Sequence, residues 1–319
     1  MDETQSPALL STLDKRWNDY YFHLKLSCQQ ISSEVVRDLR VSTRRLLSLL
    51  EFIRSMAPSS RLQQMRRSLN DQLDKLDELR DVQLMKAEIC QVPDEAQADV
   101  KPFMKYLNKQ EKKLLKSAAD QIPSFKKKSL SRRIGMIRKS LSQLTLSSGI
   151  QELQLLEPMD EAFSVVMRRS EFLDANRPAT IHRLRIAFRK FRYLMEIINP
   201  ILPAFPKENL AEMREYQKAM GKIQDIEILL DHLAEFAETK SSFKPETIIN
   251  HFQKAHQDGI AAFILDAPAC KKFWRASNTA PFPWSLDPSK EPAKVLTAEQ
   301  EKPPTGNNDD EEQKVVERA

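Results

Sequence analysis

Two stretches of the sequence place basic side chains at spacings that bring them to one face of a helix. In residues 36–46 the pattern VRDLRVSTRRL carries four arginines, and positions three, four and seven apart share one side of a helix. Arg37, Arg40 and Arg44 therefore form a stripe, with Arg45 at its edge. A guanidinium donates two parallel hydrogen bonds and stays charged at any relevant pH. The stripe indicates recognition of a phosphate-bearing anion.

A second basic stripe occurs in residues 181–192. Its members are His182, Arg185, Arg189 and Arg192, with Lys190 beside Arg189. In both stretches the leucine and phenylalanine positions fall on the opposite face, which we expect to enter a core. A solvated charged face with ion pairs to other helices remains the alternative for either stripe.

The two stripes belong to an internal repeat. Leucine matches leucine at 39 and 184, arginine matches at 40/185 and 44/189, and Arg45 matches Lys190, all 145 residues apart. A second match, 144 residues apart, pairs residues 79–85 (LRDVQLM) with residues 223–229 (IQDIEIL). Because the two motifs recur in the same order and spacing, we infer a duplication.

An aspartate stands at the same place in each copy of the second motif. Asp81 and Asp225 are predicted to orient basic side chains from neighbouring helices, because a carboxylate behind an arginine holds its donors in place. A simple structural ion pair is the alternative.

Further cations lie between the two copies. Only Glu111 and Asp120 are acidic within residues 105–139, a segment rich in lysine and arginine. Its members include Lys112, Lys113, Arg132 and Arg133. They are predicted either to extend an anion-binding surface or to form an ordinary exposed basic face.

Helical periodicity and scarce glycine predict an all-α fold. The expected helices span residues 8–30, 34–56, 60–91, 96–121, 124–146, 158–175, 179–198, 207–239 and 245–265. Prolines stand mostly between these segments. We expect two pseudo-symmetric bundles of about four helices, residues 8–146 and 150–265, in one domain over residues 1–275. Residues 276–319 lose apolar periodicity and are predicted to be a disordered acidic tail.

The charge distribution also favours an anionic partner. The chain carries a formal net charge of +5, but the tail holds five basic and nine acidic residues, so the rest is more basic still. Three distant cysteines without a CxxC pair argue against disulfides and zinc, and no cofactor is expected. The polar N-terminus and the lack of a long apolar run predict a cytoplasmic protein without membrane spans.

At these residues the chain resembles the CHAD family, the conserved histidine α-helical domain. The likeness consists of the basic helix and the downstream aspartate motif, each present twice, over about residues 8–265. It implies two four-helix bundles that bind inorganic polyphosphate in a basic groove without catalysis, and some relatives associate with polyphosphate granules. Carried over, the binding positions are Arg37, Arg40, Arg44 and Arg45, then His182, Arg185, Arg189 and Lys190, with Arg37 where the family has its first histidine.

Two other functions are weighed against this expectation. A metal-dependent phosphohydrolase needs clustered carboxylates or a nucleophile with a base, and the sequence offers neither a P-loop nor an HExxH motif. A nucleic-acid-binding protein fits the charge, but no stacking aromatics alternate with the basic residues.

Overall fold

Nine α-helices make up nearly all of the described chain. The computed structural model describes residues 5–92, 97–125, 127–148, 152–202, 205–240 and 243–285, and these residues contain no strand. The helices are α1 Gln5–Gln29, α2 Ser33–Met56, α3 Ser60–Ile89, α4 Gln97–Gln121, α5 Lys127–Ser148, α6 Glu152–Glu171, α7 Ala179–Ile198, α8 Lys207–Thr239 and α9 Glu246–Asp266. The predicted all-α class is confirmed.

Most helix bounds lie within a few residues of the predicted ones, and α6 is the exception. It begins at Glu152 rather than at 158, and it keeps Pro158 inside the helix, as α4 keeps Pro102. Both prolines lie within the first two turns of their helices, and each removes a single backbone hydrogen bond there. Proline therefore marks a helix start less sharply here than the sequence suggests.

Local signals explain where α2 and α3 begin. The hydroxyl of Ser32 accepts from the Val35 N–H at 3.3 Å, and the hydroxyl of Ser59 accepts from the Leu62 N–H at 3.3 Å. Both serines have extended backbones, as N-cap residues do. With α2 fixed in this way, its leucines enter the core and its arginines face the other side.

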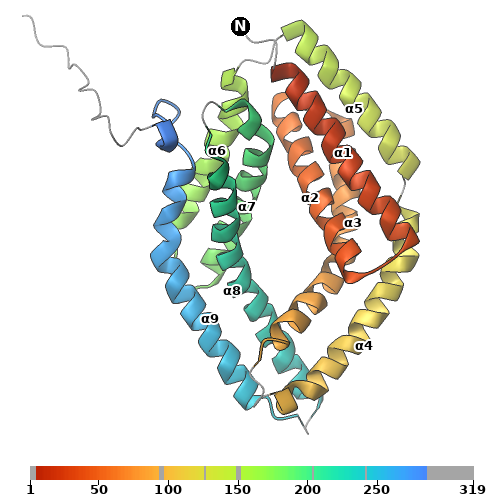
Figure 1. Ribbon diagram of the computed structural model, residues 1–319, viewed down its shortest axis with the longest axis vertical. Helices are drawn as coiled ribbons and strands as arrows, with labels where there is room; N and C mark the ends of the chain where they lie inside the picture. Colours follow the sequence, from red (N-terminus) through yellow and green to blue (C-terminus); the bar gives the residue numbers. More distant parts are fainter. Residues whose placement is uncertain are drawn as a thin grey trace, which may run out of the picture. The chain divides into compact units, whose positions relative to one another are not determined.

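The helices pack in two chain-order series that also touch each other. Helix α2 packs between α1 and α3, and α7 packs between α6 and α8 (Figure 1). Contacts also join α2 to α7, α3 to α8 and α4 to α9. The elements that carry the two basic stripes are therefore neighbours, although about 145 residues separate them in the chain.

The apolar core forms two clusters, and each draws on both series of helices. The larger cluster includes Leu39 of α2 and Phe188 of α7, which are 1% and 0% exposed. The smaller one joins α3 and α4 to α8 and α9, for example through Phe103 and Phe236, whose ring centroids lie 5.3 Å apart. Shared cores of this kind hold the two series in contact.

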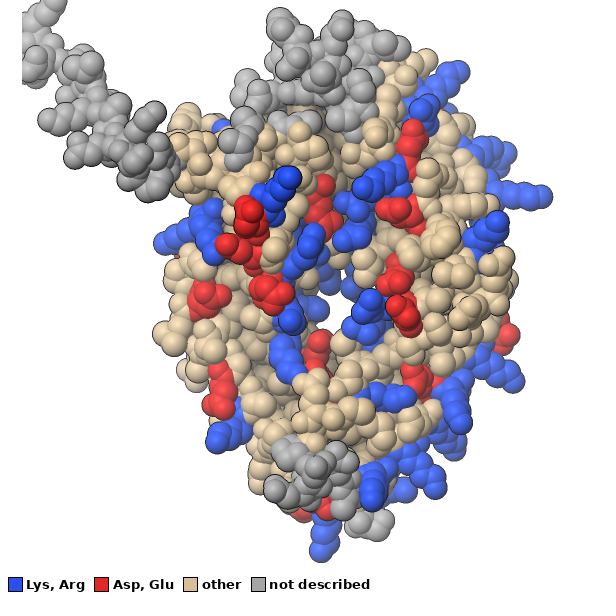
Figure 2. Space-filling view, viewed as in Figure 1, with Lys and Arg blue, Asp and Glu red and all other residues tan. Residues whose placement is uncertain are grey.

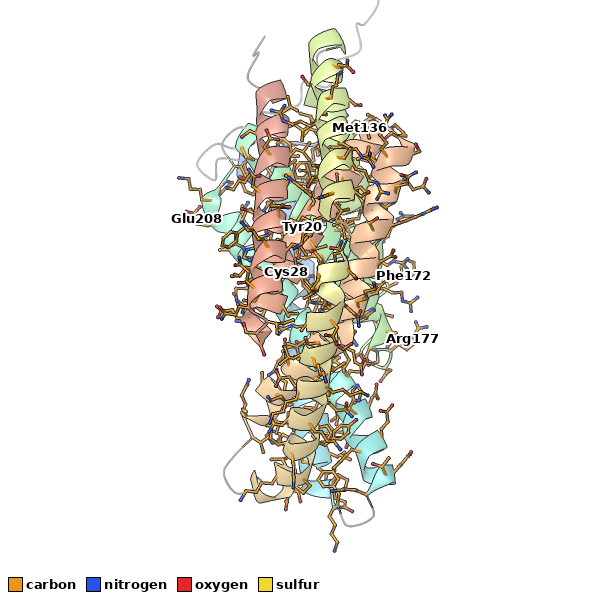
Figure 3. All side chains as sticks on the ribbon, turned by 90° about the vertical axis from the view of Figure 1, so that its right-hand side faces the viewer. Tyr20, Cys28, Met136, Phe172, Arg177 and Glu208 are labelled. Carbon is orange, nitrogen blue, oxygen red and sulfur yellow. The ribbon has the colours of Figure 1, made fainter. Side chains whose placement is uncertain are left out.

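On the flank formed by α1 and α5, shown in Figure 3, the packing includes a buried polar contact. Tyr20 of α1 is fully buried, and its hydroxyl donates to Gln72 Oε1 of α3 at 2.7 Å. Met136 of α5 lies on the same flank and is 38% exposed.

The folded part continues past α9. A 3₁₀ helix, Ala267–Phe273, leads to the buried Trp274, and the Phe282 and Trp284 rings stack with centroids 4.7 Å apart. Residues 276–285, which the sequence assigns to the tail, therefore include packed aromatic side chains. The rest of the predicted tail, 286–319, lies outside the described residues. Among the residues that the structure describes, no helix is long and apolar enough to span a membrane.

Candidate anion-binding site

In the first series, two arginines of the predicted stripe meet one carboxylate on the next helix. Arg40 is buried and donates to the Leu73 carbonyl oxygen at 3.1 Å. It also forms an ion pair with Asp77 of α3, and Arg44 Nη2 lies 3.8 Å from the same carboxylate oxygen. Asp77 is half exposed, whereas Arg40 is almost inaccessible, so the pair stands at the boundary between core and solvent.

In the second series, the matching arginines lack such a carboxylate. Arg185 is half-buried, and its Nε atom is inaccessible and has no hydrogen-bond partner. No described residue forms an ion pair within 4 Å of Arg185 or Arg189. Burial, and after it the charges of Arg44 and Arg185, lower the pKa of Arg189 to about 10. This guanidinium is thus both desolvated and surrounded by like charge.

The two stripes are brought within electrostatic reach of each other. Arg44 of α2 acts on the pKa of both Arg185 and Arg189 of α7, and Arg80 of α3 interacts with Asp225 of α8. We call this group of side chains the central cluster. It consists of Arg40, Arg44, Arg80, Arg185 and Arg189 with Asp77, Asp81 and Asp225. Five cations against three anions leave an excess of positive charge.

The surface view agrees with this composition. Figure 2 shows basic side chains gathered around an opening in the middle of the molecular face, with a smaller number of acidic ones among them. Seen from the same side, the opening lies between α2 and α3 and the ribbons of α7 and α8 (Figure 1). An extended anion could therefore reach cations from both series at once.

The two predicted orienting carboxylates act at longer range than expected. Burial raises the pKa of Asp81, against the charges of Arg40 and Arg44. Burial likewise raises the pKa of Asp225, against the charges of Arg185 and Arg80. Neither carboxylate forms an ion pair within 4 Å in the described part of the chain. The close contact to the first stripe is made instead by Asp77, one helical turn before Asp81.

The outer members of the stripes have different surroundings. Arg37 is exposed, with its Nε 3.4 Å from the neighbouring Asp38. It lines a pocket of about 400 Å³ together with Arg80 and Lys86. The Nδ1 atom of His182 lies against the Gln224 side-chain oxygen, which can only accept, so this ring nitrogen is the donor.

Arg45 and Arg192 are drawn into a separate ion cluster. Both contact the buried carboxylate of Glu196, which also lies 3.3 Å from Arg16 of α1. Arg192 donates in addition to Gln217 at 2.8 Å, and its guanidinium lies over the Tyr193 ring. We call Glu196 with its three arginines the Glu196 cluster. Each of its arginines thus forms an ion pair with a buried protein carboxylate.

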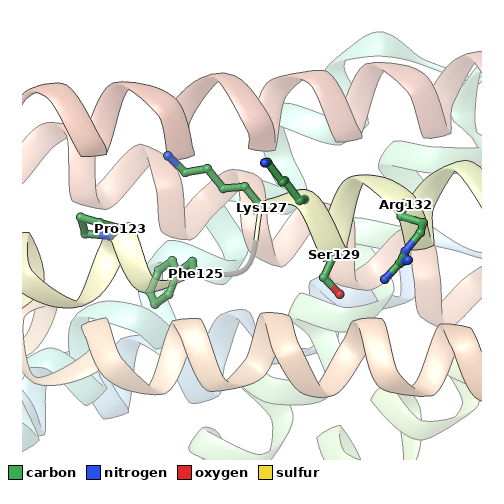
Figure 4. Close-up of a pocket in the computed structure, with 6 residues that line it drawn as sticks. Pro123, Phe125, Lys127, Ser129 and Arg132 are labelled. Atoms are coloured by element: carbon green, nitrogen blue, oxygen red, sulfur yellow. The ribbon is translucent and has the colours of Figure 1, made fainter.

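The remaining predicted binding residues have other surroundings. Lys190 is exposed and lines a pocket with Pro158 and Glu161 of α6. Lys112 and Lys113 are exposed on α4. Arg133 of α5 donates to the Ser68 hydroxyl at 3.0 Å. Arg132 lines a pocket of about 660 Å³ at the start of α5, with Lys127 and Phe125 (Figure 4).

Sequence reasoning overlooked Asp77 and Arg80 as members of the site. Arg80 precedes Asp81 within the repeated motif, and Asp77 lies one turn before it, so both share the helix face of Asp81 or its edge. That spacing was the available signal. The described residues contain no group of three or more histidine, cysteine or acidic side chains able to hold a metal ion.

Two solved structures have a fold similar to that of this chain. The chain is similar to the CHAD domain from the plant Ricinus communis, at 17% identity and a TM-score of 0.64, over 83% of this chain and 90% of that one. It is also similar to PptA from Streptomyces chartreusis, at 16% identity and a TM-score of 0.53, over 83% and 96% of the two chains. No curated protein matches it.

At these identities the likeness concerns the fold alone, and the family assignment comes from the sequence. The CHAD domain family model matches residues 13–234, which include both basic stripes and both aspartate motifs. The chain therefore belongs to the CHAD domain family.

Proposed function

We propose that this chain binds inorganic polyphosphate, without catalysis, through the central cluster. The observation that carries the proposal is the convergence of Arg44 from α2 with Arg185 and Arg189 from α7. A single phosphate needs few donors, but a chain of phosphates presents negative charge along its whole length. Cations from two separate helices suit such a ligand.

The electrostatics of the free protein favour anion binding. The lowered pKa of Arg189, caused by burial and then by Arg44 and Arg185, means that its charge is held at a cost. A bound phosphate oxygen would compensate that charge with a charge-assisted hydrogen bond. The unfavourable free energy of burying these like charges together is thus offset when the anion binds.

The proposal extends to the architecture and the location. The match between Leu39–Arg40 and Leu184–Arg185, and the similar packing of α2 and α7, support an origin of the two halves by duplication. A polyphosphate-binding protein of this kind would act in the cytoplasm, at polyphosphate granules.

The test is filter binding of long-chain polyphosphate to the full chain across a salt series. Wild type is expected to bind, with an affinity that falls roughly tenfold or more between about 50 and 200 mM salt as counterions are released. The double variant Arg185→Gln with Arg189→Gln should lose most of this affinity. The matched control is Arg183→Gln, on the same helix, because Arg183 is exposed and, among the described residues, donates only to its own helix, at the Ala179 carbonyl.

Three outcomes would contradict the proposal. Equal affinity of the double variant and Arg183→Gln would remove the central cluster from the site. Tighter binding of single-stranded DNA or RNA than of polyphosphate at the same salt would favour the nucleic-acid alternative. Release of phosphate from polyphosphate in the presence of Mg²⁺ would contradict the absence of catalysis.

A further inference from the structure

The residue one helical turn before the motif aspartate differs between the two series. On α3 this residue is Asp77, four positions before Asp81, and on α8 it is Gly221, four positions before Asp225. Asp77 contacts Arg40 and Arg44 of the neighbouring basic helix. Gly221 stands at the corresponding place beside Arg185, and a Cβ atom built on it would lie 3.8 Å from Arg185 Nε.

This difference decides whether each pair of arginines has a carboxylate. Arg40 is doubly engaged, by Asp77 and by the Leu73 carbonyl. Arg185 Nε is inaccessible yet has no hydrogen-bond partner, and an unsatisfied buried donor costs free energy. Asp225 has the largest influence of any carboxylate on the pKa of Arg185, but it forms no ion pair within the described residues.

We propose that the two series bind phosphate unequally, with Arg185 and Arg189 as the anchoring subsite and Asp77 as a built-in competitor for Arg40 and Arg44. The inference rests on the proposed polyphosphate-binding function and names the residues that make the two subsites differ in affinity. At the anchoring subsite a phosphate meets cations that form no ion pair with any carboxylate of the described residues. At the other subsite it must first displace Asp77, which already neutralises part of the charge.

Physical chemistry allows the asymmetry to be reversed by single substitutions. The 3.8 Å distance is ordinary van der Waals contact, so a Cβ atom at 221 fits without displacing Arg185. Gly221→Asp would place a carboxylate beside Arg185, and Gly221→Asn has nearly the same shape without the charge. In the other series, Asp77→Asn removes the competing charge and keeps the side-chain volume.

The experiment compares these three variants with wild type in filter binding of long-chain polyphosphate at fixed salt. Gly221→Asp should bind about tenfold more weakly than Gly221→Asn, which corresponds to the loss of one charge-assisted contact. Asp77→Asn should bind severalfold more tightly than wild type. Circular dichroism and thermal unfolding would establish that each variant is folded.

The possible results separate this inference from the function on which it rests. If wild type does not bind polyphosphate, the proposed function fails. If wild type binds and Gly221→Asp matches Gly221→Asn, the carboxylate at 221 is without effect and the unequal subsites are refuted. Weaker binding by Asp77→Asn would also overturn the inference, because Asp77 would then support the site instead of competing for it.

Discussion

Two arginines of helix α7, Arg189 and Arg192, lie three residues apart and have opposite surroundings. Arg192 belongs to the Glu196 cluster, where a buried carboxylate and Gln217 hold it. Arg189 belongs to the central cluster, where no described carboxylate pairs with it and where burial, and then the neighbouring arginines, lower its pKa. The two residues have the same chemistry and nearly the same position in the chain.

The contrast shows that the presence of a carboxylate partner, more than the number of arginines, distinguishes an arginine that stabilises the fold from one that is open to a ligand. In the Glu196 cluster, one carboxylate joins arginines of α1, α2 and α7 and so connects the two series of helices. In the central cluster, five arginines share three aspartates, of which only Asp77 makes close ion pairs in the described residues. We therefore expect substitutions in the first cluster to change stability and substitutions in the second to change binding.

The largest expected effect is that of Glu196→Gln on stability. Removing this carboxylate leaves Arg16, Arg45 and Arg192 without their shared partner, and breaking a buried pair typically costs about 3–5 kcal/mol. Urea unfolding followed by circular dichroism would measure the change. Glu51→Gln is the control, because Glu51 forms an ion pair only with the partly exposed Arg66 among the described residues, and this substitution should cost about 1 kcal/mol or less. Equal losses in the two variants would abolish the distinction drawn for Glu196.

The paired variants Arg192→Gln and Arg189→Gln test the contrast directly. Arg192→Gln should lower the free energy of unfolding by about 2 kcal/mol and leave polyphosphate affinity within about twofold. Arg189→Gln should weaken polyphosphate binding about tenfold and raise the free energy of unfolding by about 1 kcal/mol, because a desolvated like charge is removed. Filter binding and urea unfolding of both variants would check this. A stability loss in both, with unchanged binding, would contradict it.

Some features of the site follow from local sequence and could be predicted, whereas others follow from tertiary packing and could not. The helices and the basic stripes follow from local periodicity, which the sequence displays. Periodicity does not show which arginines of a stripe are paired with protein groups. Arg189 and Arg192 are distinguished by Glu196, by Gln217 and by the approach of α2, which are all features of tertiary packing.

The carboxylate partner shows the same limit at shorter range. Asp81 was favoured because it lies in the repeated motif, whereas Asp77, outside the repeat, makes the contact. A repeat identifies what two halves share, so it hides a residue that only one half possesses. Packed aromatics such as Trp284 were missed for a related reason, since a short irregular segment has no periodicity to detect.

A pH titration of binding sharpens the assignment of Arg189. Its pKa of about 10 in the free protein lies below the ordinary arginine value, mainly through burial. A bound phosphate raises that pKa, so the complex holds more protons than the free protein above pH 10, and affinity should fall as the pH rises through this value. Lysines also titrate in this range, so the profile must be compared with that of Arg189→Gln. The wild-type decline should be steeper, by up to about tenfold per pH unit, and identical profiles would exclude Arg189 from the site.

The smallest expected effect concerns Gly221 and the backbone alone. Glycine inside a long helix costs about 0.5–1 kcal/mol relative to alanine, because it loses more conformational freedom on folding. An added Cβ at Gly221 would make only ordinary contact with Arg185, so Gly221→Ala should raise the free energy of unfolding by about that amount. Urea unfolding would measure it, with Gly135→Ala as the control, since a Cβ at Gly135 meets nothing within 4 Å. A gain at 135 and a loss at 221 would show that Arg185 needs the space beside the glycine, which would make crowding, and not charge, the reason why this side of the central cluster lacks a side chain.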